Sequence, residues 1–272
     1  MVPYIPEGDN QKDIFILPLQ VSIDGKNYKE NVDLTSQEFY QKVKVTNKAV
    51  KTSQPALGDI ISTFEQIIEQ GYEEIICVNI SSEVSGTFQS VSNIADDFEG
   101  TKIHVVDSSL LSYPMYEMIQ HGKKLIEHGR SAEDVVKIIQ NDYKKVHTYI
   151  YVADIKYAYL GGGINMFAYN VGKTLKVHPI LTLKEGKMEL VKKVRTEKRS
   201  IDYMVNQVIE YAKSQPITQL NILHCNDRSI SETIKNRLKD FSNIENIHIG
   251  ALGPIIAAHG GEGSFALSWQ EK

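Results

Sequence analysis

Hydroxyl side chains gather in two short segments of this sequence. Residues 51–55 read Lys-Thr-Ser-Gln-Pro and carry the hydroxyls of Thr52 and Ser53. Residues 81–90 read S-S-E-V-S-G-T-F-Q-S and directly follow an apolar run that ends at Ile80. A turn that leads into a helix offers free backbone N–H groups and the positive end of the helix dipole, so this second segment favours an anion. Taken alone, each segment is also typical of an ordinary loop and helix start.

A third polar segment lies close to the C-terminus. Residues 253–263 read G-P-I-I-A-A-H-G-G-E-G and place His259 among glycines. Glycine lets the backbone approach a ligand closely, and the imidazole can donate a hydrogen bond to an anion. A single histidine in a glycine-rich turn is more often part of the surface structure. None of the three segments is decisive by itself.

The same residue types also permit enzymatic interpretations. Ser85, His259 and Asp107 are the types found in an acyl-transfer triad, which makes a serine-type acyl hydrolase the alternative function. The sequence lacks the G-x-S-x-G motif of many such enzymes. A phosphotransferase is a second alternative, although the sequence has neither a G-x-x-x-x-G-K-[ST] loop nor an Asp/Glu cluster typical of a magnesium site. Both enzymatic alternatives stay open on these residues alone.

The first half of the chain predicts elements that would position these segments. Apolar strands alternate with amphipathic helices, and Thr35 with Glu38 forms a capping box at the start of one helix. This alternation predicts an open, doubly wound and mainly parallel sheet, which binds ligands beyond the carboxyl ends of its strands. The expected strands cover residues 14–17, 21–23, 74–80 and 102–106, and further helices are expected around residues 60–68, 91–98, 114–128 and 131–145.

The pattern changes after about residue 147. Two apolar runs flank Lys184-Glu185-Gly186-Lys187, which predicts an antiparallel hairpin. We therefore expect two domains, an N-terminal α/β domain at residues 1–147 and a C-terminal α+β domain at residues 148–272. The elements expected in the second domain are strands at 177–183, 188–194, 219–224, 246–249 and 264–269, with helices at 198–213 and 229–241.

Composition limits the classes of function. The chain has 272 residues, 42% of them hydrophobic and 24% charged, which is ordinary for a globular protein. Its net charge of −4 argues against a nucleic-acid partner, which needs a basic face. The two cysteines lie in apolar runs, so they indicate buried residues rather than a disulfide framework. No apolar stretch reaches 18 residues and no signal pattern begins the chain, so we expect a cytoplasmic protein.

The motifs in their order resemble the DegV family. The resemblance covers T-S-Q-P, the S-S-x-x-S-G-T-x-Q-S turn, the V-D-S of residues 106–108 and G-P-x-I-x-x-H-x-G-x-G. It extends from about Ile14 to the C-terminus. Each motif is moderately specific, whereas their ordered combination is strong.

The resemblance implies a lipid-binding protein without catalytic residues, cofactor or metal. Members of this family have two α/β domains and bind a long-chain fatty acid between them. They present its carboxylate to a separate ATP-dependent fatty acid kinase, which makes acyl-phosphate for bacterial phospholipid synthesis, and transient membrane contact is compatible with this role. Carried over to this sequence, Thr52 and Ser85 would hold the carboxylate, with His259 near it. Ser53, Gly86 and Thr87 would belong to the same fatty-acid site, and Arg195 would contact the kinase.

Two further expectations concern the acyl chain and departures from the family pattern. The family's first strand is expected to be missing, and Gly163 stands where the family has the arginine of G-G-R-I, which puts the kinase contact in doubt. An apolar tunnel would bury the acyl chain, although each candidate for its wall is more simply a core residue. These candidates are Ile80, Phe88, Met115, Met118, Ile164, Met166 and Phe167.

Overall fold

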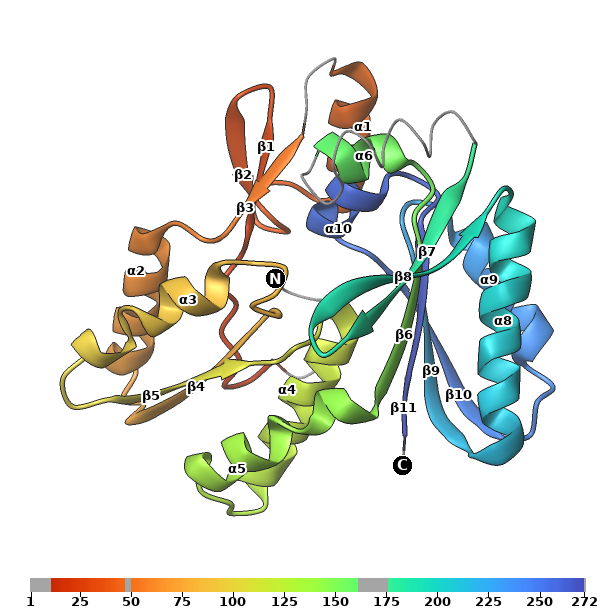
Figure 1. Cartoon of the computed structure of the whole chain (residues 1–272). Coiled ribbons are helices and arrows are strands. Elements are labelled where there is room, and N and C mark those ends of the chain that lie inside the picture. The colour runs from red at the N-terminus through yellow and green to blue at the C-terminus, as the bar shows by residue number, and fades with distance from the viewer. Residues whose placement is uncertain (1–10, 47–49, 161–175, 272) are drawn as a thin grey trace. The chain divides into compact units, whose positions relative to one another are not determined.

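The computed structural model describes residues 11–46, 50–160 and 176–271, which form two compact units. The described part of unit 1 comprises residues 11–19, 53–144 and 185–187. The described part of unit 2 comprises residues 20–46, 50–52, 145–160, 176–184 and 188–271. Both units combine helices with sheet, so the expected α/β class with two parts is confirmed (Figure 1).

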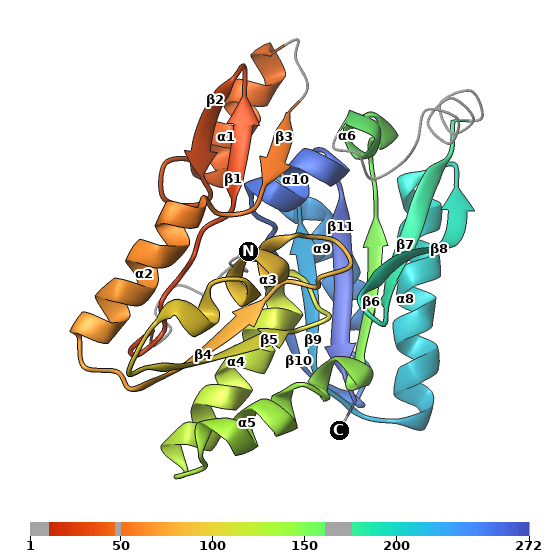
Figure 2. The same ribbon diagram turned by 60° about the vertical axis from the view of Figure 1, so that its left-hand side comes forward.

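Unit 1 is built on two parallel strands, β4 (Glu74–Asn79) and β5 (Lys102–Asp107). Figure 2 shows α2 and α3 next to this pair of strands. Ile60 and Phe64 of α2 and Val91 of α3 pack against side chains of both strands. The helices of the unit are α2 (Leu57–Glu69), α3 (Thr87–Ser92), α4 (Ser112–Glu127) and α5 (Ala132–Ile139), with 3-10 turns at Ala95–Asp97 and Asp142–Lys145.

The strand expected at residues 14–17 is not a strand in the structure. Residues 14–19 lack regular secondary structure, and β4 has β5 as its only ladder partner among the described residues. An apolar run becomes a strand only when a neighbouring backbone pairs with it, and Pro18 has no N–H to contribute to such pairing. The parallel sheet of unit 1 is consequently narrower than the doubly wound sheet that was expected.

Unit 2 contains a six-stranded mixed sheet with the order β10-β9-β11-β6-β7-β8. β10 is parallel to β9, whereas β11 is antiparallel to both β9 and β6. The expected hairpin is confirmed as β7 and β8, whose two-residue turn has positive φ at Glu185 and Gly186. The strands are β6 (Val146–Tyr151), β7 (His178–Lys184), β8 (Lys187–Val194), β9 (Ile217–His224), β10 (Ile244–Ala251) and β11 (Phe265–Gln270).

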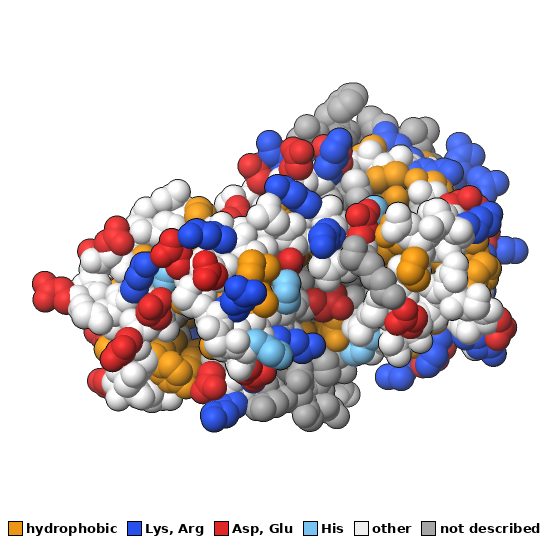
Figure 3. Space-filling view, turned by 90° about the horizontal axis from the view of Figure 1, so that it is seen from below, with side chains coloured by type: hydrophobic (Ala, Val, Ile, Leu, Met, Phe, Trp, Pro, Cys, Tyr) orange, Lys and Arg blue, Asp and Glu red, His pale blue; other side chains and the backbone are white. Residues whose placement is uncertain are grey.

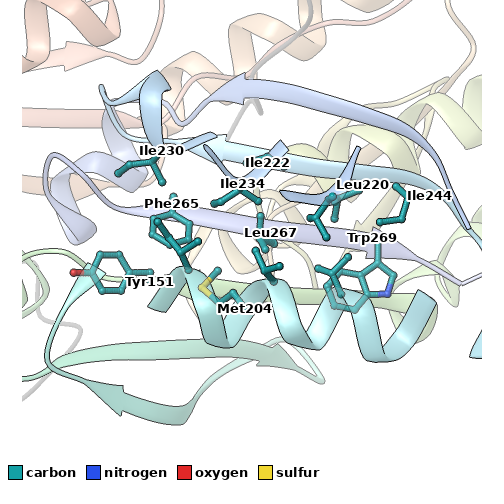
Figure 4. Close-up of a cluster of buried hydrophobic side chains, with 14 of the residues drawn as sticks. Tyr151, Met204, Leu220, Ile222, Ile230, Ile234, Ile244, Phe265, Leu267 and Trp269 are labelled. Atoms are coloured by element: carbon teal, nitrogen blue, oxygen red, sulfur yellow. The ribbon is translucent and has the colours of Figure 1, made fainter. Parts of the chain in front are cut away.

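The core of unit 2 lies between this sheet and two helices, α8 (Glu197–Ser214) and α9 (Arg228–Leu238). Alternate residues of β11 and β9 face the helices because side chains along a strand repeat with a period of two. Figure 4 shows Phe265, Leu267 and Trp269 of β11 around the Met204 side chain of α8. This core fixes the end of β10 and the start of β11, and the glycine-rich residues 253–263 lie between them.

A second, three-stranded sheet of unit 2 has the order β2-β1-β3. The hairpin of β1 and β2 turns at Asp24-Gly25, and Thr35 and Glu38 form the predicted capping box at the start of α1. Its elements are β1 (Gln20–Ile23), β2 (Lys26–Lys29), β3 (Lys51–Ser53) and α1 (Ser36–Val45), and the C-terminal half adds α6 (Ile155–Leu160) and α10 (Pro254–Gly260).

The grouping of residues 20–52 differs from the expected division at residue 147. These residues belong to unit 2 with the C-terminal half of the chain. The reason is a packing contact between β1 and α10, supported by a hydrogen bond from the Ile255 N–H to the Glu30 carboxyl group. Sequence order alone cannot reveal such a contact.

Two further properties of the chain are the distribution of charged side chains on its surface and the polarity of its helices. Figure 3 shows Lys and Arg side chains interspersed with Asp and Glu over the face drawn, which agrees with a chain of 30 basic and 34 acidic residues. Within the described residues, no helix is long and apolar enough to cross a membrane.

Candidate functional site

Thr52 and His259 meet in unit 2, although 207 positions separate them in the sequence. Thr52 lies in the middle of β3, and His259 lies near the end of α10. The distance between Thr52 Oγ1 and His259 Nε2 is 2.9 Å, which is a hydrogen bond whose direction depends on the tautomer of the imidazole. The structure therefore brings together two of the three residues assigned to the carboxylate.

The surroundings of His259 favour its neutral form. Its side chain is partly buried, and burial lowers the pKa of the imidazole below its ordinary value of 6.5. Loss of water disfavours the protonated form, so the neutral imidazole is the main species at pH 7. A neutral imidazole has one N–H donor and one acceptor nitrogen, and it can direct the Thr52 hydroxyl without carrying a charge itself.

The turn that carries Ser85 begins at the carboxyl end of β4 in unit 1. The Ser85 N–H donates to the Ser81 carbonyl at 3.2 Å, and Ser81 Oγ accepts from the Glu83 N–H at 3.3 Å. Asp107, at the end of β5, accepts hydrogen bonds from the N–H groups of Ser82 and Ser109 and from the Ser82 hydroxyl. One carboxylate therefore fixes the first part of the turn to the adjacent strand end.

Ser85 and Thr87 present a pair of hydroxyls at the end of this turn. The distance between Ser85 Oγ and Thr87 Oγ1 is 2.8 Å, and the Thr87 N–H donates to Ser85 Oγ at 3.3 Å. α3 has only 6 residues and its N-terminal residue already has this partner. The two hydroxyls are thus groups that this turn can offer to an anion.

The T-S-Q-P segment also contacts this turn within unit 1. Gln54 Nε2 donates to Ser90 Oγ at 2.7 Å, and a Cβ added to Gly86 would lie 2.4 Å from Gln54 Oε1. Gly86 therefore leaves the space that the Gln54 amide occupies. Ser53 is exposed, and it precedes Gln54 directly. Two motifs that are distant in sequence thus lie side by side, and Gln54 is a contact residue that sequence reasoning did not single out.

Unit 1 also contains an apolar cavity of about 210 Å³. Its wall combines residues 13–17 with side chains of α2, β4, α3 and α4, including Thr87 and Met115. Successive residues 75–78 of β4 all line it, so the cavity runs along the edge of β4 that has no ladder partner among the described residues. An acyl chain has no group that could pair with the backbone N–H and C=O groups along this edge.

The other candidates for the tunnel wall are placed as follows. Ile80 and Met118 are fully buried core residues, and Phe88 is partly buried. Met115 is buried and lines the cavity along β4. Three further candidates, Ile164, Met166 and Phe167, together with Gly163, lie outside the described residues.

Arg195 is exposed in the connection between β8 and α8. Exposed lysines and an arginine surround it along the chain, at positions 192, 193, 198 and 199. This basic segment belongs to a chain whose net charge is −4, so its local charge is opposite to that of the whole protein. Such a segment can attract an acidic partner and speed its association.

The groups of the alternative hydrolase triad have other roles in the structure. Asp107 accepts its hydrogen bonds from Ser82 and Ser109, and the partner of His259 Nε2 is Thr52. Among the described residues, no cluster of three or more His, Cys, Asp or Glu side chains is arranged to hold a metal ion. Thr52 and His259 form a hydroxyl–imidazole pair in unit 2, and Ser85 and Thr87 form a hydroxyl pair in unit 1. Each pair can donate a hydrogen bond to an anion.

Comparisons with known proteins define the family. The model of the DegV family, described as an uncharacterised protein family, matches residues 4–272. The DegV domain-containing protein BH3627 of Halalkalibacterium halodurans is 31% identical over 265 residues, which cover 97% of this chain and 93% of the relative. The chain belongs to the DegV family.

Solved structures agree with this assignment. The fatty acid binding DegV family protein SAG1342 of Streptococcus agalactiae superimposes with a TM-score of 0.88 at 27% identity, covering 99% of this chain and 96% of that one. The Fatty Acid Kinase (Fak) B3 protein of Streptococcus pneumoniae, solved with linoleic acid, gives a TM-score of 0.80 at 21% identity, covering 94% and 90%. The second likeness shows the shared fold.

Proposed function

We propose that this protein binds a long-chain fatty acid through its carboxylate and does not transform it. The observation that carries the proposal is the Thr52 hydroxyl, which is held 2.9 Å from a partly buried, neutral His259 at the positions of two family motifs. The chain belongs to a family in which a solved member binds fatty acids. Thr52 and Ser85 are the proposed ligands of the carboxylate, with Ser53, Gly86, Thr87 and His259 around them.

Hydrogen-bond direction supports an anionic head group. A carboxylate only accepts hydrogen bonds, so the bound state requires the tautomer in which His259 Nε2–H donates to Thr52 Oγ1. The Thr52 O–H is then free to donate to the ligand. When the Thr87 hydroxyl donates to Ser85 Oγ, which also accepts from the Thr87 N–H, the Ser85 O–H can likewise turn toward the ligand. Hydroxyl donors bind a carboxylate without neutralising it and leave its oxygens chemically accessible.

The acyl chain supplies most of the affinity in this proposal. Burial of each CH₂ group contributes about 0.8 kcal/mol, so a long chain outweighs the few hydrogen bonds at its head. The head-group hydroxyls then determine which end of the ligand is held where. Selectivity for fatty acids over alcohols or methyl esters follows from these donors.

Single hydroxyl deletions test the head-group site. Ser85→Ala and Thr52→Ala should each weaken fatty-acid binding by about 1–3 kcal/mol because a carboxylate oxygen loses its donor. The measurement is titration of delipidated protein with oleate by calorimetry. Ser62→Ala and Thr233→Ala are matched controls, since both residues are exposed and donate their hydroxyl hydrogen to a carbonyl within their own helix. Wild-type affinity in the Ser85/Thr52 double variant would show that the head group binds elsewhere.

A kinase partner is the second part of the proposal. We infer that the bound carboxylate is presented in the cytoplasm to a separate ATP-dependent fatty acid kinase, which makes acyl-phosphate for phospholipid synthesis. The exposed basic segment around Arg195 supports an acidic docking partner. Arg195→Glu should slow acyl-phosphate formation by the cognate kinase while leaving oleate affinity unchanged, and Arg130→Glu, at an exposed arginine of unit 1, should not. Equal rates in both variants would exclude Arg195 from the contact.

A further inference from the structure

Glu30 is a carboxylic side chain that is almost completely buried. It follows β2 directly, pairs with Leu34 in an isolated bridge, and is 3% exposed. Burial raises the pKa of its carboxyl group to about 7, and Oε2 has no hydrogen-bond partner among the described residues. Burying such a group is unfavourable unless it makes compensating contacts. The hydrogen bond that its side chain makes within the described residues is therefore informative.

That contact is with the first turn of α10. Glu30 Oε1 accepts a hydrogen bond of 3.0 Å from the Ile255 N–H. Pro254 occupies the first position of the helix and has no N–H, so Ile255 supplies the first backbone donor of α10. A Cβ added to Gly253 would lie 2.4 Å from Glu30 Oε1, so the carboxyl group occupies the place of a side chain at residue 253.

The same small sheet holds α10 at a second point. Ile255 and His259 are four residues apart, which is about one helical turn. Glu30 follows β2 and contacts the first of these residues, whereas Thr52 lies on β3 and contacts the second. β2 and β3 are the two outer strands of the sheet β2-β1-β3. The helix is thus fixed to opposite edges of one sheet, one turn apart.

We infer that Glu30 is a positioning residue, which fixes the first turn of α10 and thereby sets the imidazole of His259 against the Thr52 hydroxyl. The inference rests on the proposed role of this pair at the head group. A carboxyl group that served stability alone would be poorly suited to this place, because its burial disfavours the charged form. Its value lies in the placement of a helix that carries a ligand-binding side chain.

The test follows the titration of His259 by NMR in lipid-free protein labelled at histidine. Glu30→Ala should release the first turn of α10 and admit water, so the pKa of His259 should rise toward the ordinary value of 6.5. Glu30→Gln keeps a carbonyl oxygen for the Ile255 N–H and should restore the wild-type titration. Gly253→Ala retains Glu30 but displaces its carboxyl group, so it should shift the His259 pKa in the same direction as Glu30→Ala.

Controls separate positioning from a general loss of stability. Gly253 has φ −71°, so an alanine there acts through the contact rather than through backbone strain. Gly58→Ala is a control because the new methyl group meets open space. Glu38→Ala is a second control, because it removes the cap of α1, which belongs to unit 2 as α10 does. Both variants should leave the pKa of His259 unchanged. An unchanged His259 titration in folded Glu30→Ala and Gly253→Ala would overturn the inference.

Fatty-acid binding is measured separately on the same variants. Glu30→Ala and Gly253→Ala should each raise the Kd for oleate severalfold, and Glu30→Gln should remain close to wild type. If the wild-type protein binds no oleate, the proposed function fails, yet the shift of His259 still reports on the contact. If oleate binds equally in all variants while the pKa of His259 shifts, Glu30 positions the imidazole as inferred, and the proposed role of the Thr52–His259 pair at the head group fails.

Discussion

The Thr52 hydroxyl and the His259 imidazole form a contact between two neutral groups, which is unusual for a site that should hold an anion. The direction of this hydrogen bond matters, since a neutral imidazole that donates from Nε2 leaves the Thr52 O–H free to donate to a ligand. A nearby carboxylate would also favour protonation of His259, so ligand binding and the protonation state of this residue are coupled. Glu30 belongs to the same network through α10 and carries the strongly shifted carboxyl group of unit 2.

The raised pKa of Glu30 predicts a pH dependence of stability. The folded-state pKa of about 7 exceeds the ordinary 4.5, so the folded protein holds this proton more tightly than the unfolded chain does. Its contribution to the free energy of unfolding is complete below pH 4.5 and is lost as the pH rises through 7. At about 1.4 kcal/mol per pKa unit, the loss amounts to about 3 kcal/mol.

Glu30→Gln isolates this contribution. The free energy of unfolding is measured with urea at pH 5 and at pH 8. Its decrease from pH 5 to pH 8 should be larger in wild type than in Glu30→Gln. The comparison of the two proteins cancels the histidines, whose lowered pKa values act in the opposite direction. Identical pH profiles would mean that the Glu30 carboxyl group titrates normally.

At the scale of elements, the ends of β4 and β5 support the turn that carries Ser85. Asp107 closes β5 and binds the Ser82 end of the turn, so the strand register between β4 and β5 sets the position of the hydroxyl pair. The other edge of β4 faces the cavity lined by residues 13–17. The turn is therefore held by β5, on the side of β4 that has a ladder partner.

Removal of the Asp107 carboxylate should loosen this turn. Asp107→Ala leaves two backbone donors and the Ser82 hydroxyl without their acceptor, so the free energy of unfolding should fall by about 1–3 kcal/mol. Oleate affinity should fall as well, because Ser85 loses its fixed position. Asp97→Ala, at an exposed acidic residue, is the control for both measurements. Unchanged oleate affinity in a destabilised Asp107→Ala would separate the turn from the ligand.

Local features of the fold could be predicted from the sequence, and non-local ones could not. The capping box of Thr35 and Glu38 and the turn at Glu185-Gly186 depend on neighbouring residues, and both are present as expected. The strand predicted at residues 14–17 failed because strand formation requires a partner from elsewhere in the chain. Glu30 gave no signal at all, since its partner Ile255 lies 225 positions away. Thr52 and His259 were paired by resemblance to a family, not by their spacing.

At the scale of the whole molecule, two α/β units each contribute residues that the family resemblance assigns to one ligand. The chain passes from one unit to the other between Thr52 and Ser53, inside the T-S-Q-P motif. Each unit presents hydroxyls that can donate to a carboxylate. These hydroxyls support the proposed binding of a fatty acid through its carboxylate.

Extraction of the purified protein tests the central claim most directly. Protein expressed in bacteria is washed, extracted with organic solvent and analysed by mass spectrometry, alongside the Ser85/Thr52 double alanine variant. The account predicts about one long-chain fatty acid per wild-type chain, recovered as the free acid, and a clear loss in the variant. An extract without fatty acid, together with no uptake of added oleate by the wild-type protein, would contradict it.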